Sequence, residues 1–95
     1  MIRHTVTFTL DHQSGSKEEA VFLDAARGLA LIPTVKKFEC LKEIGKKNNF
    51  NFGLSMEFEN MNAYEEYNNH PFHQDFVQEH WIPNVSDYIE IDYEL

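Results

Sequence analysis

The 95-residue sequence predicts a ferredoxin-like α+β fold, with one four-stranded antiparallel sheet covered by helices on a single face. Three observations predict this class. Four segments alternate apolar and polar residues as half-buried strands do, helical segments repeat apolar residues at helical spacing, and their order along the chain is β-α-β-β-α-β. The length suits one hydrophobic core, so we expect a single domain over residues 1–95.

The strands follow from alternation of apolar and polar residues. They are expected at residues 2–10, 38–44, 50–58 and 88–95, with a turn at 45–49. Because helices cover one face of such a sheet, its other face is left open. This open face is expected to be semi-polar and to carry Thr5, Thr7, Thr9, Ser55 and Tyr88. Small hydroxyls and an aromatic ring suit a second copy of the chain, so we expect a homodimer that packs through the open sheet face.

Capping residues and prolines delimit the helices. The first helix begins at a capping box, residues 16–19, and should stop before Pro33. A short helix is expected to be capped near Asn62. Pro71 suits the first turn of a further helix, which should end near Pro83.

Charge and composition restrict the partners. The net charge is −8, and all eight lysines and arginines lie between Arg3 and Lys47. Such a chain repels a polyphosphate backbone, so we expect no nucleic acid partner. No apolar run reaches the roughly 18–20 residues of a membrane span, so no membrane partner is expected either. A lone cysteine, Cys40, fits a reducing compartment, which indicates a cytoplasmic protein.

Inward-facing histidines are the most informative feature of the sequence. At 100° per residue, the helix from Pro71 places His73 and His80 near the centre of its apolar arc, facing the sheet. His4 shares the apolar face of its strand, and Tyr67 lies at the end of the preceding helix. Buried polar groups cost about 1–3 kcal/mol each when unpaired. The rings therefore either satisfy one another and the backbone, or line a cavity that holds water or a ligand.

Proton transfer is the chemistry that these residues suit best. His73 would lie in the first helical turn, where the helix dipole disfavours the imidazolium and leaves a neutral base. Tyr67 could then donate its hydroxyl to a carbonyl oxygen as an adjacent C–H bond ionises. This chemistry needs no cofactor. No metal site is predicted, because His73 and His80 are about 10 Å apart along the helix and share their arc with no carboxylate.

Several segments together resemble one protein family. They are residues 2–6, 31–35 and 50–58, the block Tyr67-Asn68-Asn69-His70-Pro71-Phe72-His73, and the C-terminal pair Asp92-Tyr93. In this order and spacing, the chain resembles the stress-responsive α/β-barrel (Dabb) domain family over essentially its whole length. The resemblance implies a protomer that pairs into a dimeric α+β barrel.

The resemblance also implies roles for individual residues. Most family members have no assigned biochemical function, and a few plant relatives are polyketide cyclases that close a ring by aldol condensation. The catalytic tyrosine and histidine of those cyclases look like Tyr67 and His73, and their pocket histidine looks like His4. Phe22 and Leu54 look like wall positions of the pocket.

Three functions are therefore left open by the sequence. The leading hypothesis is a pocket for a small apolar carbonyl compound, in which His73 is the base, Tyr67 the donor, and His4 and His80 bind the substrate. If the protein is an enzyme, it would be a cofactor-independent lyase or cyclase. The alternatives are a noncatalytic stress-associated barrel with histidines as internal hydrogen-bonding groups, and a cofactorless monooxygenase that shares only the architecture.

Overall fold

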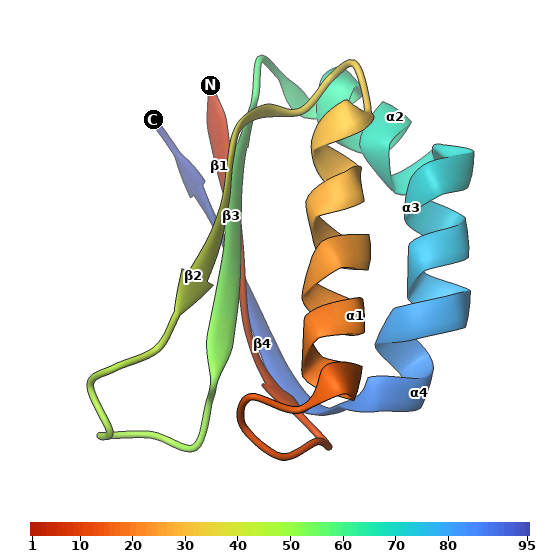
Figure 1. The fold of residues 1–95 in the computed structure, drawn as a ribbon. Coiled ribbons are helices and arrows are strands. Elements are labelled where there is room, and N and C mark those ends of the chain that lie inside the picture. The colour runs from red at the N-terminus through yellow and green to blue at the C-terminus, as the bar shows by residue number, and fades with distance from the viewer.

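One antiparallel sheet forms the first layer of the molecule. A computed structural model describes residues 1–95, and its strands are arranged in the order β2-β3-β1-β4 (Figure 1). All three strand pairs are antiparallel. The strands are β1 (Ile2–Leu10), β2 (Lys36–Lys42), β3 (Phe52–Phe58) and β4 (Val85–Glu94). The predicted ferredoxin-like α+β fold is therefore confirmed.

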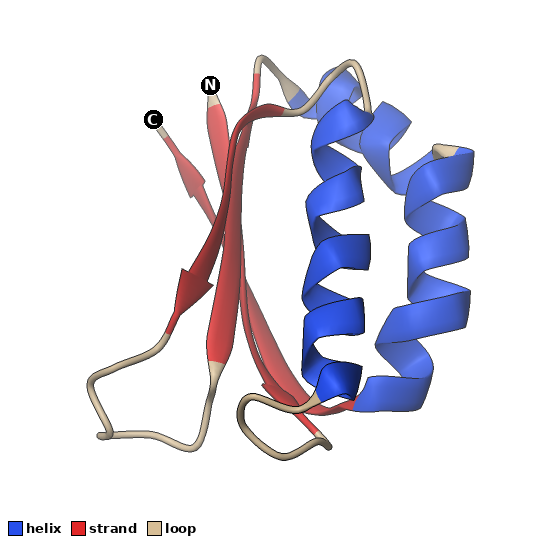
Figure 2. Cartoon of the chain, in the orientation of Figure 1, coloured by secondary structure: helices blue, strands red, loops and turns tan.

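The helices form the second layer and lie on one side of the sheet, as Figure 2 shows. Gln13 to Ser16 lead into α1, and the chain returns to the same side after β3. The helical segments are α1 (Lys17–Arg27), the 3₁₀ turn η1 (Gly28–Leu31), α2 (Met61–Asn69), α3 (Pro71–Phe76), the π-helical turn η2 (Val77–Trp81) and α4 (Ile82–Asn84). The opposite face of the sheet is covered by no element of the chain (Figure 2).

Side-chain caps fix where two helices begin. The Ser16 hydroxyl accepts a hydrogen bond from the Glu19 backbone N–H at 3.2 Å, as the capping box predicts. The Glu19 carboxylate instead accepts from the N–H of Gly15, one residue earlier than a capping box requires. Helix α2 is capped by Asn60, whose side chain accepts from Ala63 N–H at 2.9 Å. Asn62, expected as the cap, is already inside the helix.

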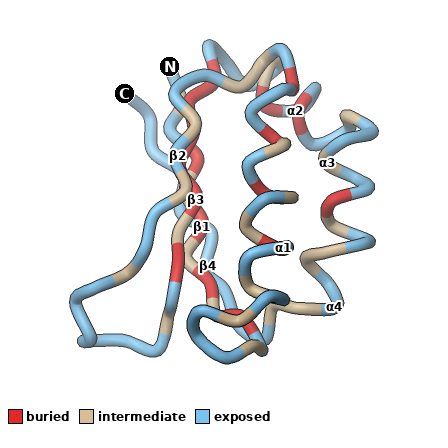
Figure 3. Tube along the Cα trace, viewed as in Figure 1, coloured by how far each residue is buried: buried red, intermediate tan, exposed pale blue.

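Aromatic packing between the two layers builds the core. Buried positions of the sheet and the helices face each other in Figure 3. Phe22 of α1 is 1% exposed, and its ring centroid lies 5.5 Å from that of Phe8 on β1 and 5.5 Å from that of Phe76 on α3. Burying rings of this size contributes about 1.5–3 kcal/mol per side chain. These contacts therefore pack α1 against the sheet and α3 against α1.

The register of β4 corrects the predicted open face. Tyr88 pairs with Phe8, and directly paired residues point to the same side of a sheet. Tyr88 therefore lies on the side that the helices cover, where its ring centroid is 5.4 Å from that of Trp81. The exposed side of β4 instead presents Ile89, Ile91 and Tyr93, which are 50%, 48% and 52% exposed. The open face is thus more apolar than the sequence indicated.

The β2–β3 connection also differs from the prediction. Strand β2 ends at Lys42, and Ile44, which was expected at its end, is 82% exposed in the connecting loop. Strand β3 begins at Phe52, two residues after the predicted start. Apolar character alone could not distinguish a strand residue from an exposed loop residue here.

Candidate functional site

A cavity lies between the helix-covered side of the sheet and the α2–α4 segment of the chain. Its volume is about 480 Å³, and ten of its 14 lining residues are hydrophobic. This size and composition suit a small, mostly apolar ligand. Of the six residues that the sequence singled out, four line the cavity: His4, Leu54, Tyr67 and His73.

Tyr67 and His73 form the first polar cluster of the cavity. Tyr67 lies near the end of α2 and His73 in the first turn of α3, so the sharp turn at His70-Pro71 brings their ring centroids to 4.5 Å. The His73 Nδ1 lies 3.0 Å from the Asn68 carbonyl oxygen. A carbonyl oxygen can only accept, so Nδ1 carries the proton and the neutral ring keeps its lone pair on Nε2.

Burial sets the protonation states of this cluster. Loss of hydration lowers the pKa of His73 below its ordinary value, and the hydrogen bond to Asn68 opposes this effect without cancelling it. His73 is therefore a neutral base at pH 7. Burial, and secondarily the charge of Glu90, raises the pKa of the Tyr67 phenol far above its ordinary value. The Tyr67 hydroxyl therefore stays protonated and can donate.

The Tyr67 hydroxyl has no hydrogen-bonding partner within the chain and is therefore free to bind a ligand. Tyr67 is only 3% exposed, yet its hydroxyl makes no hydrogen bond within the chain and is not sealed from solvent. The remaining open space next to this side chain is the cavity that it lines. A ligand in the cavity would therefore meet an unused phenolic donor beside an unused imidazole acceptor.

A second polar cluster, of His4, Tyr64 and Asp92, lies where β1 meets β4. His4 Nδ1 lies 2.6 Å from Asp92 Oδ1, and the Tyr64 hydroxyl donates to Asp92 Oδ2 at 2.9 Å. The Tyr64 oxygen is also 2.8 Å from His4 Nδ1. Because the carboxylate accepts, Nδ1 bears a proton, and Nε2 is the ring nitrogen of His4 that has no hydrogen-bonding partner in the chain. Burial, followed by the hydrogen bond to Asp92, raises the pKa of Tyr64.

The sequence alone did not identify Tyr64 and Asp92 as site residues. Asp92 faces His4 directly in the β1–β4 register, so alternation along the last strand, combined with the correct pairing, could have found it. Glu90, another residue that the sequence analysis missed, lines the cavity from the same strand. No lysine or arginine lines this cavity.

His80 and Phe22 are corrections to the predicted site. His80 stacks on Phe76, with ring centroids 5.9 Å apart, and borders a separate shallow groove between α1 and α3. His80 is displaced because it lies in the π-helical turn η2. A π-helical turn contains more residues than an α-helical turn, so the rotation of 100° per residue used for the prediction does not hold there. The extra residue rotates His80 away and turns Trp81 and Ile82 toward the cavity. Phe22 belongs to the core and does not line the cavity.

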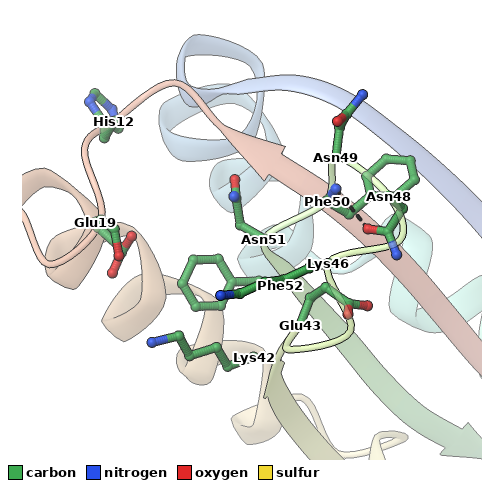
Figure 4. Close-up of a pocket in the computed structure, with 11 residues that line it drawn as sticks. His12, Glu19, Lys42, Glu43, Lys46, Asn48, Asn49, Phe50, Asn51 and Phe52 are labelled. Atoms are coloured by element: carbon green, nitrogen blue, oxygen red, sulfur yellow. Dashed lines mark hydrogen bonds between the residues drawn. The ribbon is translucent and has the colours of Figure 1, made fainter.

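A polar pocket lies beyond the end of β1, between the β1–α1 and β2–β3 loops (Figure 4). Its volume is about 340 Å³. Its polar groups largely hold the loops together: Asn51 accepts from the Leu10 N–H at 3.0 Å, and His12 pairs with Asn84 at 2.6 Å. Asn51 and His12 thus have partners within the chain, whereas the Tyr67 hydroxyl and the Nε2 atom of His73 in the apolar cavity have none.

No three histidine, cysteine, aspartate or glutamate side chains are grouped closely enough to hold a metal ion. None of the helices has the length and apolar character needed to cross a membrane.

The shifted pKa of His73 predicts a pH-dependent stability. Above pH about 6.5, the ordinary histidine pKa, His73 is neutral in both the folded and the unfolded state. Below that pH, the unfolded chain takes up a proton at His73 that the folded chain resists, so the free energy of unfolding should fall. Urea titrations at pH 7.5 and 5.5 should show a smaller pH-dependent loss for His73→Gln than for the unchanged protein. Equal losses would show that His73 titrates normally.

The carboxylate of Asp92 is expected to stabilise the fold as well as to orient His4. Asp92→Asn keeps the size of the side chain but removes the negative charge that accepts two hydrogen bonds. The free energy of unfolding, measured by urea titration, should therefore fall by about 1–2 kcal/mol. Asp87→Asn, on the same strand but paired with Thr9, is the control and should change stability little. An unchanged stability for Asp92→Asn would mean that the cluster is not formed in solution.

Comparisons with known proteins agree with this fold. A protein of the Dabb family with a ferredoxin-like fold from Mesorhizobium loti is 49% identical, with a TM-score of 0.95 over 99% of this chain and 95% of that one. A dimeric ferredoxin-like protein of unknown function from Thermobifida fusca is 21% identical, with a TM-score of 0.83 over 99% and 90% of the two chains. The hydroxynitrile lyase of Passiflora edulis is 17% identical, with a TM-score of 0.86 over 99% and 92%.

The two similarities below 25% identity show a shared fold alone. No curated protein matches the sequence. The sequence profile described as the stress responsive A/B barrel domain, Dabb, matches residues 2–95. With this match and the close relative from Mesorhizobium loti, the chain belongs to the Dabb stress responsive A/B barrel domain family.

Proposed function

We propose that the cavity binds a small apolar carbonyl compound and that the protein catalyses proton transfer at the carbon next to the carbonyl. One observation carries the proposal: the free Nε2 of His73 and the free hydroxyl of Tyr67 belong to rings whose centroids are 4.5 Å apart on the wall of one apolar cavity. A neutral base beside a phenolic donor is the pair that this chemistry requires.

The proposed step moves one proton. Nε2 of His73 accepts the proton from the α-carbon, and the electrons of the broken C–H bond form the carbon–carbon double bond of an enolate. The Tyr67 hydroxyl donates a hydrogen bond to the oxygen on which the negative charge develops. The enolate then either takes the proton back or attacks a second carbonyl carbon of the same molecule, which closes a ring. In the second case the attacked carbonyl oxygen becomes an alkoxide, and the protonated His73 returns its proton to that oxygen. His4, held by Asp92, would orient the substrate through its own Nε2.

The name of one structural neighbour is compatible with this class of reaction. The protein from Passiflora edulis is a hydroxynitrile lyase. Lyases of carbonyl adducts also need a base and a donor at a carbonyl oxygen. The support is by analogy, because the two chains share only their fold.

Hydrogen–deuterium exchange tests the proposal without knowledge of the natural substrate. Acetophenone has a small apolar ring and an exchangeable methyl group next to its carbonyl. In D₂O, the protein should accelerate loss of the methyl signal from the proton NMR spectrum, and His73→Gln should lose the acceleration. If the unchanged protein binds acetophenone without accelerating exchange, the cavity is a binding site only. If it does not bind at all, the noncatalytic barrel is the better description.

We also infer that the protein is a homodimer that packs through the open sheet face. Several structural neighbours are described as dimeric ferredoxin-like proteins. The half-exposed side chains of Ile89, Ile91 and Tyr93 lie on the uncovered face of β4, and their burial in an interface would be favourable.

A further inference from the structure

The proposed carbonyl site has a charged residue at its edge that the proton-transfer step does not use. Glu90 of β4 pairs with Val6, so its side chain is on the helix-covered side of the sheet, where it lines the cavity. Because Glu90 is exposed and lines the cavity, we take its carboxylate to lie where the cavity opens to solvent, which is called the mouth below. Glu90 makes no ion pair within the chain, because the five salt bridges of the structure involve other residues.

Aromatic rings surround the same part of the cavity. Tyr88 precedes Glu90 by two residues on the same strand face, and Trp81 packs against Tyr88 edge to face with a centroid distance of 5.4 Å. Phe76 and Tyr67 also line the cavity and are buried, whereas Tyr88 is half exposed. The faces of aromatic rings attract cations, and clusters of such rings recognise organic ammonium groups.

The electrostatics of the cavity favour one sign of ligand charge. No lysine or arginine lines the cavity, so no such side chain balances the negative charge of Glu90 there. Every lysine and arginine of the chain precedes residue 48. His73 is neutral at pH 7 because burial lowers its pKa. The Glu90 charge reaches into the cavity, where it contributes to the raised pKa of Tyr67. A carboxylate ligand would be repelled here, and an ammonium ligand attracted.

We propose that the cavity selects carbonyl compounds that also carry a protonated amine, with the ammonium held at the mouth by Glu90 and the rings of Tyr88 and Trp81. This inference rests on the proposed function and names its substrate class. The carbonyl end would lie deeper, at the Tyr67 and His73 pair, and the apolar walls would contact the skeleton between the two groups. The site thereby discriminates against keto acids of the same size.

Three matched ketones test the selectivity: acetophenone, 4-(aminomethyl)acetophenone and 4-acetylbenzoate. They share one skeleton and differ in charge at the position opposite the carbonyl. Affinities are measured by NMR titration at pH 7 and low salt. The ammonium compound should bind at least about fivefold more tightly than acetophenone, and the carboxylate more weakly than either, as expected for a partly exposed charge pair. Added salt should reduce the difference.

Two variants connect the selectivity to Glu90. Glu90→Gln keeps the shape and removes the charge, so it should abolish the preference for the ammonium compound while the affinity for acetophenone stays unchanged. Glu94→Gln is the matched control, since Glu94 lies on the same face of β4, pairs with Ile2 and does not line the cavity. Glu94→Gln should leave the order of the three ketone affinities unchanged. Melting curves of both variants confirm that they are folded.

The outcomes separate the inference from the function on which it rests. If acetophenone binds and its exchange is accelerated, but the ammonium preference is absent, the charge selectivity is wrong and the carbonyl site stands. If the preference is present but survives Glu90→Gln, the role of Glu90 is wrong and the carbonyl site again stands. If 4-acetylbenzoate binds most tightly, the selectivity is likewise wrong. If none of the three ketones binds, the carbonyl site itself fails, and the inference fails with it.

Discussion

Tyr67→Phe should reduce the acceleration of acetophenone exchange by about 100-fold, because removing one donor to a developing oxyanion costs roughly this much. The fold should be unaffected. The Tyr67 hydroxyl makes no hydrogen bond within the chain, so its removal leaves no partner unsatisfied and should change the free energy of unfolding by less than about 0.5 kcal/mol. Exchange rates from NMR and urea titrations on the same samples measure the two effects.

The control for this variant is Tyr93→Phe. It deletes the same group from the opposite face of the sheet, where Tyr93 is half exposed, and should leave the exchange rate unchanged. A structural role for Tyr67 would give the reverse pattern, with lower stability and an unaltered rate. Loss of stability together with loss of rate would leave the donor role without support, since unfolding alone would then explain the result.

Ile91→Lys should convert the proposed dimer into monomers. Ile91 lies in the middle of the exposed apolar stripe of β4, opposite Thr5 of β1. In a dimer packed through this face, the lysine would be buried without a partner, which costs about 3–5 kcal/mol and weakens association by at least about 100-fold. Light scattering at micromolar concentration should report twice 11.2 kDa for the unchanged protein and 11.2 kDa for the variant.

Val21→Lys is the matched control for the dimer. Val21 lies on α1 and is 51% exposed, much like Ile91 at 48%, but on the helical side of the molecule. It should stay dimeric. A mass of 11.2 kDa for the unchanged protein would contradict the dimer itself. A dimer that survives Ile91→Lys but not Val21→Lys would move the interface to the helical side.

Local sequence signals predicted the elements of the fold, because each depends on residues close together in the chain. Alternation located both ends of β1 correctly, and Ser16 marked the start of α1. The errors occurred where one signal had two interpretations. Asn60 and Asn62 are the same residue type two positions apart, and in the structure it is Asn60 that has the extended backbone and accepts from the Ala63 N–H. Ile44 is apolar but exposed, since β3 offers it no partner.

The candidate site was predictable only in part. His4, Tyr67 and His73 could be assigned inward positions from the periodicity of single segments, and they line one cavity in the structure. Asp92 and Glu90 could not, because their relevance depends on the register of β1 with β4, two strands separated by most of the chain. His80 was misplaced because a π-helical turn is invisible to a fixed helical period.

The amino-acid sequence by itself determined the order of strands and helices, the inward faces of the first strand and of α3, and the family. The tertiary structure decided which side of the sheet Tyr88 occupies, which carboxylate orients His4 and which residues enclose the cavity. The division has a physical reason: periodicity and capping are local properties of the backbone, whereas strand register and cavity walls arise from contacts between distant segments. Those contacts form only when the whole core packs.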